Sequence, residues 1–189
     1  MIRIALVGGI GSGKTFISKL FGYPVFNADN SVAKIYSKNK KIYYKLKKEF
    51  SGYFTSFPIK KIEIINVIIQ NSNNIKKISK IIHPEVRKDL QKFLKKNIKK
   101  KIVILDIPLF LENKLNRKKD IIVFVQSSNK ESFKKVKKRK NFNNLIYENL
   151  KKLQFSLKFK KRKSQYVIKN NYNKDLARKN VKDILNKIL

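Results

Sequence analysis

The sequence of 189 residues predicts an α/β fold in which helices cover both faces of a parallel sheet. The first observation is that residues 101–106 and 120–125 are nearly continuous apolar runs, which are typical of strands buried on both faces. The second is that such strands alternate with segments of helical apolar spacing, which favours right-handed crossovers between parallel strands. At this length we expect one compact domain with insertions rather than two full domains.

A glycine-rich segment follows the first predicted strand, Ile2–Val7. Residues 8–15, GGIGSGKT, fit the phosphate-binding pattern G-x-x-x-x-G-K-S/T, and a helix-compatible run over 16–21 comes next. Glycines let backbone N–H groups approach a polyphosphate, and the start of the helix adds partial positive charge. We expect Lys14 to reach the β- and γ-phosphates of a nucleoside triphosphate, and Thr15 to ligate Mg²⁺. The alternative is a glycine-rich turn that matches the pattern by chance.

A short second strand is expected at residues 24–27, before a long lysine-rich helical region. This region, from Ser31 to Asn97, is interrupted at 52–58 and again at His83-Pro84, after which a helix is expected over 85–94. The two apolar runs provide the third and fourth strands. Because the helical region has no strand of its own, it is expected to carry substrate specificity.

The C-terminal part continues the alternation of helices and strands. Residues 129–163 contain two very basic helical stretches, which are separated near 141–144. A last strand is expected at 166–168, and an amphipathic helix over 175–188 closes the chain.

The composition is strongly basic, with 47 Lys and Arg against 12 Asp and Glu and a formal net charge of +35. Such an excess is typical of nucleic-acid-binding proteins. Here it is mostly Lys rather than Arg, is spread over nearly every predicted helix, and accompanies abundant Ile and Asn, which indicates compositional drift on solvated faces. We therefore expect no specific nucleic-acid partner, only incidental binding at low salt.

The composition also excludes several classes of protein. The chain has no cysteine, so it can form neither disulfides nor thiolate metal sites. No apolar run approaches the roughly 18 residues of a membrane span. The N-terminal apolar run leads into the glycine-rich loop rather than a cleavage site for secretion. A cytoplasmic protein without a membrane partner is expected.

Several motifs, in this order along the chain, resemble those of the dephospho-CoA kinase family. After the phosphate loop, Asn27-Ala28-Asp29 stands where the family has Asp-Ala-Asp, and Ile82-His83-Pro84 matches its His-Pro pair. Residues 106–113, DIPLFLEN, are similar to its PLLfE segment. Gln154 corresponds to the glutamine of its lid, and residues 167–170, VIKN, to its terminal vidN strand. The set covers essentially the whole chain.

The resemblance implies a three-layer P-loop NTPase fold with a five-stranded parallel sheet, a helical substrate-binding insertion and a helical lid. The single domain would have its core at 1–30, 98–128 and 164–189, a CoA-binding insertion at 31–97 and a mobile lid at 129–163. The implied reaction transfers the γ-phosphoryl group of ATP, with Mg²⁺, to the ribose 3′-hydroxyl of dephospho-CoA.

The resemblance also implies an ATP-binding set: Gly11, Ser12, Gly13, Lys14, Thr15 and Phe16. Phe16 replaces a hydroxyl residue that is usual in the family, so a contact to the α-phosphate is expected to be lost. The family's basic pair in the lid corresponds to Lys135 and Arg139. With Lys14, Arg139 is predicted to act in catalysis, because its planar fork matches a phosphate edge. The alternative for both lid residues is a solvated basic face.

On the acceptor side, Asp29 is predicted to accept or orient the proton of the ribose hydroxyl, and it is also a candidate N-cap for a helix over Ser31–Tyr36. Asp106 ends a strand, where its carboxylate could hold a Mg²⁺-coordinating water or accept hydrogen bonds from neighbouring loops. The further substrate-binding residues implied are His83, Lys61, Pro108 and Leu109. His83, the only histidine, is expected to orient the substrate or a helix start, or to have a purely structural role.

The loop alone also fits two rival assignments. Another small-molecule P-loop kinase, of the nucleoside or shikimate type, would share it but is not expected to combine residues 27–29, His83-Pro84 and Pro108-Leu109. A basic nucleic-acid-binding P-loop protein would gather Arg and aromatic residues on one face. Here the aromatic residues are scattered at helical spacings that suit core packing.

A third alternative is an inactive relative of the family. Lys61 stands where Arg is usual, Lys135 replaces an Arg, and Gln165 replaces an Asp before the last strand. The intact Lys14 and Asp29 favour an active enzyme.

Overall fold

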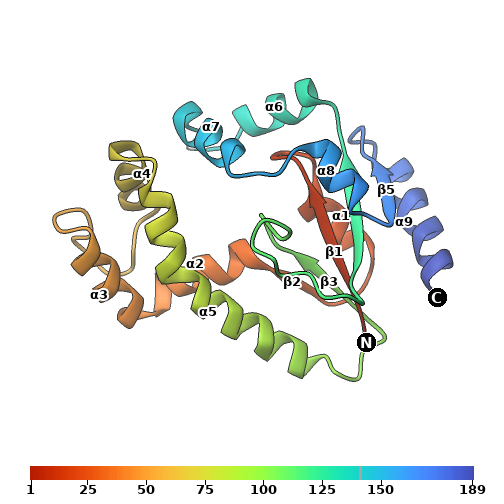
Figure 1. Cartoon of the computed structure of the whole chain (residues 1–189), viewed down its shortest axis with the longest axis horizontal. Coiled ribbons are helices and arrows are strands. Elements are labelled where there is room, and N and C mark those ends of the chain that lie inside the picture. The colour runs from red at the N-terminus through yellow and green to blue at the C-terminus, as the bar shows by residue number, and fades with distance from the viewer. Residues whose placement is uncertain (141) are drawn as a thin grey trace. The chain divides into compact units, whose positions relative to one another are not determined.

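The chain forms two compact units, which the computed structural model describes over residues 1–140 and 142–189 (Figure 1). The sheet unit comprises Met1–Asn27, Asn97–Phe142 and Leu150–Leu189. The helical unit comprises Ala28–Lys96 and Asn143–Asn149. Most of the predicted insertion therefore lies in the helical unit, together with a short piece of the predicted lid.

The strands of the sheet unit all pair in parallel, in the order β2-β3-β1-β4-β5. They are β1 (Ile2–Gly8), β2 (Val25–Asn27), β3 (Ile102–Asp106), β4 (Ile121–Gln126) and β5 (Tyr166–Lys169). Every residue of β3 is buried, as its apolar run predicts for an inner strand. The predicted five-stranded parallel sheet is confirmed, and its carboxyl edge carries the phosphate loop and the ends of β2 and β3.

Helices pack on this sheet with their apolar faces. The helices lying wholly in the sheet unit are α1 (Lys14–Leu20), α6 (Asn129–Lys137), α8 (Leu157–Arg162) and α9 (Lys174–Ile188). Ile17 of α1 and Val181 and Ile184 of α9 join Ile4 and Ile104 of the strands in one buried core. Helix α7 (Asn144–Lys152) runs from the helical unit into the sheet unit.

The helical unit has its own core. It contains α2 (Ala28–Lys38), α3 (Lys40–Glu49), α4 (Lys61–Gln70) and α5 (Asn74–Lys96). Their amphipathic spacing brings Leu46, Val67 and Ile82 together with Phe54 of the loop between α3 and α4, away from solvent. This half of the chain can therefore fold around apolar contacts without a strand.

Glu63 fixes the loop that joins α3 to α4. Its carboxylate accepts hydrogen bonds from the backbone N–H groups of Thr55 at 2.9 Å and Lys60 at 2.8 Å. Burial alone would raise the pKa of Glu63, but these hydrogen bonds outweigh burial and hold that pKa below its usual value.

The predicted break at His83-Pro84 is wrong, because α5 continues through Pro84. A proline inside a helix removes one hydrogen bond and costs about 3 kcal/mol. The buried positions Ile75, Ile78 and Ile82 before it, and Leu90 after it, follow helical spacing along the one helix. Since each buried aliphatic side chain is worth about 1.5–3 kcal/mol, this continuous face outweighs the lost bond.

Two further boundaries differ from expectation. The helix expected from Ser31 begins at Ala28, which is buried in its first turn. The predicted lid contains α8 in addition to α6 and α7, because Ser156 caps a further helix by accepting from the Phe159 N–H at 3.2 Å. Residue 141, in the predicted separation near 141–144, lies outside the described residues. Within residues 1–140 and 142–189, no helix has both the length and the apolar content of a membrane span.

Candidate active site

Two glycines of the phosphate loop have backbone angles and surroundings that exclude a side chain. Gly11 has φ of 81° and Gly13 has φ of 89°, in the left-handed region. A Cβ atom on Gly11 would lie 2.5 Å from the carbonyl oxygen of Ser132 in α6, and one on Gly13 would collide with the amide nitrogen of Asn170. The loop is therefore packed closely against the first helix of the predicted lid and the segment that follows β5.

Lys14 begins α1, and its ammonium group lies against the loop that precedes it. Its Nζ donates to the carbonyl oxygen of Gly9 at 2.7 Å and to that of Gly8 at 3.2 Å. The Lys14 ammonium group therefore lies beside the backbone of the loop, as the phosphate-binding pattern requires.

The next two residues of α1 are exposed. Thr15 lies in the first turn with its side chain toward solvent, and its carbonyl oxygen accepts from Ser18 Oγ at 3.0 Å. The ring of Phe16 is 38% exposed at the position where a hydroxyl group is usual in the family. Ser12, by contrast, is buried, and its Oγ has no hydrogen-bond partner among the described residues.

A hydrogen-bonded pair joins the ends of β2 and β3. Asn27 Nδ2 donates to Asp106 Oδ2 at 2.6 Å, because the two residues stand opposite each other in the parallel register. Asp106 is only 3% exposed. An aspartate at position 27 would bring a second carboxylate to this distance, and two such charges repel. Asn27 therefore suits its neighbour chemically.

The side chains of Asp106 and Thr15 have the donor chemistry that Mg²⁺ prefers. Carboxylate and hydroxyl oxygens suit this hard cation, which often binds through one or two protein groups and takes its other ligands from phosphates and water. In the part of the chain that the structure describes, no group of three or more His, Cys, Asp or Glu side chains could hold a metal ion. The residues thus fit a metal that binds together with a nucleotide.

The turn after β3 holds the predicted residues Pro108 and Leu109. Pro108 is exposed, and Leu109 has φ of 55°, which is uncommon for a residue with a side chain. The turn is closed by hydrogen bonds from the Asn113 N–H to the Leu109 carbonyl at 2.9 Å and from the Leu115 N–H to the Phe110 carbonyl at 3.1 Å.

Glu112, at the end of this turn, holds the returning end of the predicted lid. Its Oε1 lies 2.8 Å from Lys160 Nζ and accepts from the Phe155 N–H at 2.9 Å. Lys160 also donates to Gln154 Oε1 at 3.1 Å. The side chains of Lys160 and Glu112 are 3% and 9% exposed, so this is a buried ion pair. The sequence indicated Glu112 and Gln154 only through the family motifs, and nothing distinguished Lys160 from the neighbouring lysines.

Asn170 and Tyr172 also contact the phosphate loop, and neither was predicted as a site residue. Asn170 Nδ2 donates to the Ser12 carbonyl at 2.8 Å, and Tyr172 Oη donates to the Gly11 carbonyl at 2.9 Å. Asn170 could be found in sequence only as the end of the family's last strand motif. Tyr172 gives no local signal.

The basic residues of the predicted lid differ in their surroundings. The ammonium group of Lys135 lies 5.1 Å from the centre of the Tyr172 ring, in a cation–π contact. Arg139 follows the end of α6 and is exposed, with its backbone N–H bonded to the Val136 carbonyl at 3.0 Å. Both side chains are exposed, and Lys135 differs by its contact with the Tyr172 ring.

Asp29 lies in the helical unit, in the first turn of α2, and is exposed. The interpretation of Asp29 as an N-cap of a helix over Ser31–Tyr36 is wrong, because α2 starts before it. The start of a helix favours a negative charge such as this one. Ser31, two residues further on, donates from Oγ to Asp89 Oδ2 at 2.7 Å and so joins α2 to α5.

The other two predicted residues of the helical unit lie on different helices. His83 is half-buried within α5, so it does not orient a helix start. Burial, together with the charge of Arg87, lowers the pKa of His83, and the neutral imidazole is favoured. Lys61 is the first residue of α4 and is exposed.

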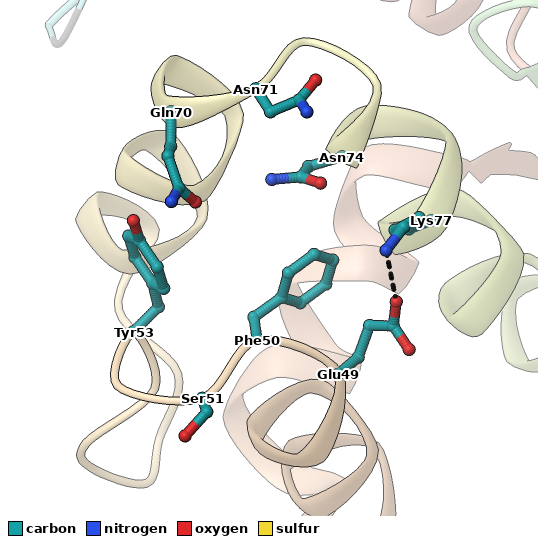
Figure 2. A pocket seen from close by; sticks show the side chains of 8 residues that line it. All are labelled: Glu49, Phe50, Ser51, Tyr53, Gln70, Asn71, Asn74 and Lys77. Atoms are coloured by element: carbon teal, nitrogen blue, oxygen red, sulfur yellow. Dashed lines mark ion pairs between the residues drawn. The ribbon is translucent and has the colours of Figure 1, made fainter.

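The helical unit also contains a pocket of about 390 Å³ where the ends of α3 and α4 meet the start of α5 (Figure 2). Amide, hydroxyl and aromatic side chains line it, and Lys77 Nζ lies 3.0 Å from Glu49 Oε1 at one side. The lining residues are Glu49, Phe50, Ser51, Tyr53, Gln70, Asn71, Asn74 and Lys77. None of the predicted site residues is among them.

The sheet order, the loop after β1 and the buried acid at the end of β3 define a P-loop phosphotransferase. Comparison with known proteins narrows this class. A sequence model of the dephospho-CoA kinase family matches residues 2–175, and the chain belongs to this family. It is therefore a kinase that takes its phosphate from a nucleotide, and the rival assignments are not favoured.

Individual relatives agree with the family match. The dephospho-CoA kinase of Wolbachia pipientis wMel is 31% identical over 193 residues, which cover 98% of this chain and 97% of the relative. The crystal structure of TT1252 from Thermus thermophilus superposes with a TM-score of 0.80 at 23% identity, over 100% of this chain and 98% of that one. Dephospho-CoA kinase from Campylobacter jejuni gives 0.64 at 19% identity, over 98% and 96%. The two structures support the fold.

Proposed function

We propose that this chain transfers the γ-phosphoryl group of ATP to the ribose 3′-hydroxyl of dephospho-CoA, with coenzyme A and ADP as products. The observation that carries the proposal is the family match over residues 2–175, in a chain whose phosphate loop keeps Lys14 in place. Phosphoryl transfer demands mainly positioning and charge neutralisation, and the carboxyl edge of the sheet supplies both.

On the donor side, backbone N–H groups of residues 11–16 bind the phosphates of ATP. Lys14 exchanges the carbonyl oxygens of Gly8 and Gly9 for oxygens of the β- and γ-phosphates. Mg²⁺, when bound with the nucleotide, neutralises phosphate charge. The Thr15 hydroxyl would ligate it directly, and Asp106 would do so through a water. Support comes from the exposed hydroxyl of Thr15 and the buried carboxylate of Asp106.

On the acceptor side, Asp29 takes the proton of the 3′-hydroxyl group while the oxygen of that hydroxyl group forms a bond to the γ-phosphorus. The bond from that phosphorus to the β–γ bridging oxygen breaks, and ADP leaves with the electron pair. Arg139 binds the oxygens of the group in transfer through its planar fork. The exposure of both side chains supports these roles, since each must reach a bound ligand.

The remaining predicted residues bind the acceptor. Lys61 supplies positive charge for its phosphates, neutral His83 supplies a hydrogen bond, and Pro108 with Leu109 forms a contact surface. Residues 31–97 then act as the CoA-binding insertion and residues 129–163 as the lid of a single domain. The separate core of the helical unit supports an insertion that folds as its own module.

We place the reaction in the cytoplasm, where ATP is abundant, with no specific nucleic-acid partner. Exposed lysines such as Lys41, Lys92 and Lys158 lie on different helices. This spread supports the interpretation that the positive charge lies on solvated faces.

The proposal is tested by ADP release from Mg²⁺–ATP with dephospho-CoA, adenosine and shikimate as separate acceptors. We expect turnover with dephospho-CoA alone, and a product that a 3′-nucleotidase converts back to dephospho-CoA. The variant Lys14→Met measures the background from contaminating kinases. Turnover of adenosine or shikimate without turnover of dephospho-CoA would overturn the assignment.

The metal is tested separately by chelation. EDTA should abolish turnover and excess Mg²⁺ should restore it. In Asp106→Asn, half-saturation should require more Mg²⁺ because a neutral amide holds the coordinating water less strongly. An unchanged Mg²⁺ requirement in this variant would remove Asp106 from the metal site.

A further inference from the structure

A chain of hydroxyl groups ends on the phosphate loop. Ser127 Oγ lies 2.6 Å from Ser132 Oγ, which lies 3.2 Å from Tyr172 Oη. Tyr172 Oη in turn donates to the Gly11 carbonyl oxygen at 2.9 Å. These residues come from the segment after β4, from α6 and from the segment after β5, so the chain joins three parts of the sheet unit to one peptide group.

The direction of these hydrogen bonds follows from the number of hydrogens. Each hydroxyl has one hydrogen, and a carbonyl oxygen can only accept. Since Tyr172 gives its hydrogen to Gly11, it must accept from Ser132, and Ser132 must accept from Ser127. All donors then point the same way along the chain, an arrangement in which each bond polarises the next.

The bond to Gly11 also fixes the following N–H group. A peptide group is planar and trans, so the Ser12 N–H points opposite to the Gly11 carbonyl. This N–H donates only weakly, to the Gly9 carbonyl at 3.3 Å, and that oxygen already accepts from Lys14 at 2.7 Å. A phosphate oxygen is a stronger acceptor and would take its place. Asn170 orients the next peptide similarly, through its 2.8 Å bond to the Ser12 carbonyl.

The backbone of Tyr172 has an unusual conformation at this point. Its φ is 65°, in the left-handed region that bulky side chains rarely adopt. The conformation is held by a 3.0 Å hydrogen bond from the Tyr172 N–H to Asn170 Oδ1, and the Lys135 ammonium lies over the ring. Strained residues of this kind cluster at functional sites, where the surrounding structure imposes the angle.

We propose that Tyr172 is a positioning residue for nucleotide binding. Through the Gly11 carbonyl it aims the Ser12 N–H at the phosphates, and through Ser132 it makes nucleotide affinity depend on α6. The inference rests on the proposed function for the identity of the nucleotide, which is ATP as substrate and ADP as product.

The decisive variant is Tyr172→Phe, which removes one oxygen atom and keeps the ring under Lys135. We expect ADP to bind about three- to tenfold more weakly by calorimetry, the worth of one neutral hydrogen bond. The KM for ATP should rise similarly, while kcat and the KM for dephospho-CoA stay within about twofold of wild type. The matched control is Tyr44→Phe, on a side chain that is 63% exposed in the helical unit, with unchanged ADP affinity.

Ser132→Ala separates positioning from simple packing. Because Ser132 acts on the loop through Tyr172, its loss should weaken ADP binding in the presence of Tyr172 and have no effect in the Tyr172→Phe background. Wild-type ADP affinity in Tyr172→Phe, or equal increases in both KM values with a fall in Tm, would overturn the inference. Absence of dephospho-CoA turnover by the wild type would overturn the proposed function instead, and ADP affinities would still decide the role of Tyr172.

Discussion

Lys14 and Asp106 of the sheet unit are held differently from Asp29 and Lys61 of the helical unit. In the sheet unit, Lys14 donates to two loop carbonyls and Asp106 accepts from Asn27. In the helical unit, Asp29 and Lys61 lie exposed near the starts of their helices. The difference follows from the two kinds of core, since buried parallel strands give fixed ends, whereas amphipathic helices leave one face in water.

This contrast indicates how the two halves of the reaction are prepared. Lys14 and Asp106, which are proposed to act on ATP and its metal, are oriented when the chain folds, so the proposal leaves little reorganisation for the moment of transfer. The groups proposed to bind the acceptor, Asp29 and Lys61, lie exposed on the first turns of their helices. Substitution of Lys14 should therefore change stability and nucleotide binding together, while substitution of Asp29 should mainly change turnover.

The largest expected effect tests the helical unit. Asp29→Asn removes the proposed proton acceptor and should lower kcat by about 10²–10⁴-fold. Because Asp29 is exposed, ADP affinity should stay at the wild-type value, and Tm should fall by no more than about 4 °C, the worth of one charge at a helix start. Steady-state kinetics and thermal unfolding measure both, with Asp183→Asn on the exposed side of α9 as the control. A kcat within about twofold of wild type would rule out the role of Asp29.

Lys14→Met provides the matching test in the sheet unit. Loss of one charge-stabilising donor should lower kcat/KM for ATP by about 10²–10³-fold. The Gly8 and Gly9 carbonyls also lose a donor, so Tm should fall further than in Asp29→Asn. Lys19→Met, an exposed position of the same helix, is the matched control. A wild-type Tm in Lys14→Met would break the proposed link between stability and nucleotide binding.

Lys160→Met removes the buried cation that pairs with Glu112 at the end of the predicted lid, and it changes no residue of the phosphate loop. It leaves the buried Glu112 carboxylate without its cation, which should destabilise the protein by about 3 kcal/mol in urea unfolding. Lys88→Met breaks the exposed pair with Glu85 and should cost less than about 1 kcal/mol. Equal effects of the two variants would mean that burial of the Glu112 pair has no consequence.

The smallest expected effect is the contribution of Glu63, in the helical unit, to the pH dependence of stability. The pKa of Glu63 is lower in the folded chain than in the unfolded chain, so the unfolded chain binds more protons as the solution is acidified. The stabilisation from Glu63 is complete above the ordinary pKa of about 4.3 and is lost as the pH falls through its folded pKa. Urea unfolding between pH 6 and pH 3 should show a shallower pH dependence for Glu63→Gln than for the control Glu49→Gln.

The sheet could be predicted because the signal for a buried parallel strand lies within a few consecutive residues. The runs that became β3 and β4 needed no knowledge of their neighbours. The path of α5 could not be predicted in this way, since Pro84 argues locally for a break. What overrides it is the burial of Ile82 and Leu90 on the two sides of the proline, which is a tertiary effect.

The site residues likewise divide into those that a local sequence pattern predicts and those that only tertiary contacts reveal. The phosphate loop is a contiguous pattern, so Lys14 and Thr15 were predicted from their spacing. Tyr172 was missed because its partner Gly11 is 161 positions away, and no pattern joins them. Lys160 was missed because it is one of 47 basic residues, and only the structure shows which of them is buried beside Glu112.

The close packing around Gly11 and Gly13 has a consequence for how this sequence can drift. A descendant that lost the ability to bind nucleotides would still need both glycines, because Ser132 and Asn170 leave no room for a methyl group. Its lysine at position 14 would be constrained only by its hydrogen bonds to the Gly8 and Gly9 carbonyls, which is a weaker constraint than a steric clash. In lineages of this kind, retention or loss of the lysine at position 14 is a better indicator than retention of the glycines of whether natural selection still acts on phosphate transfer.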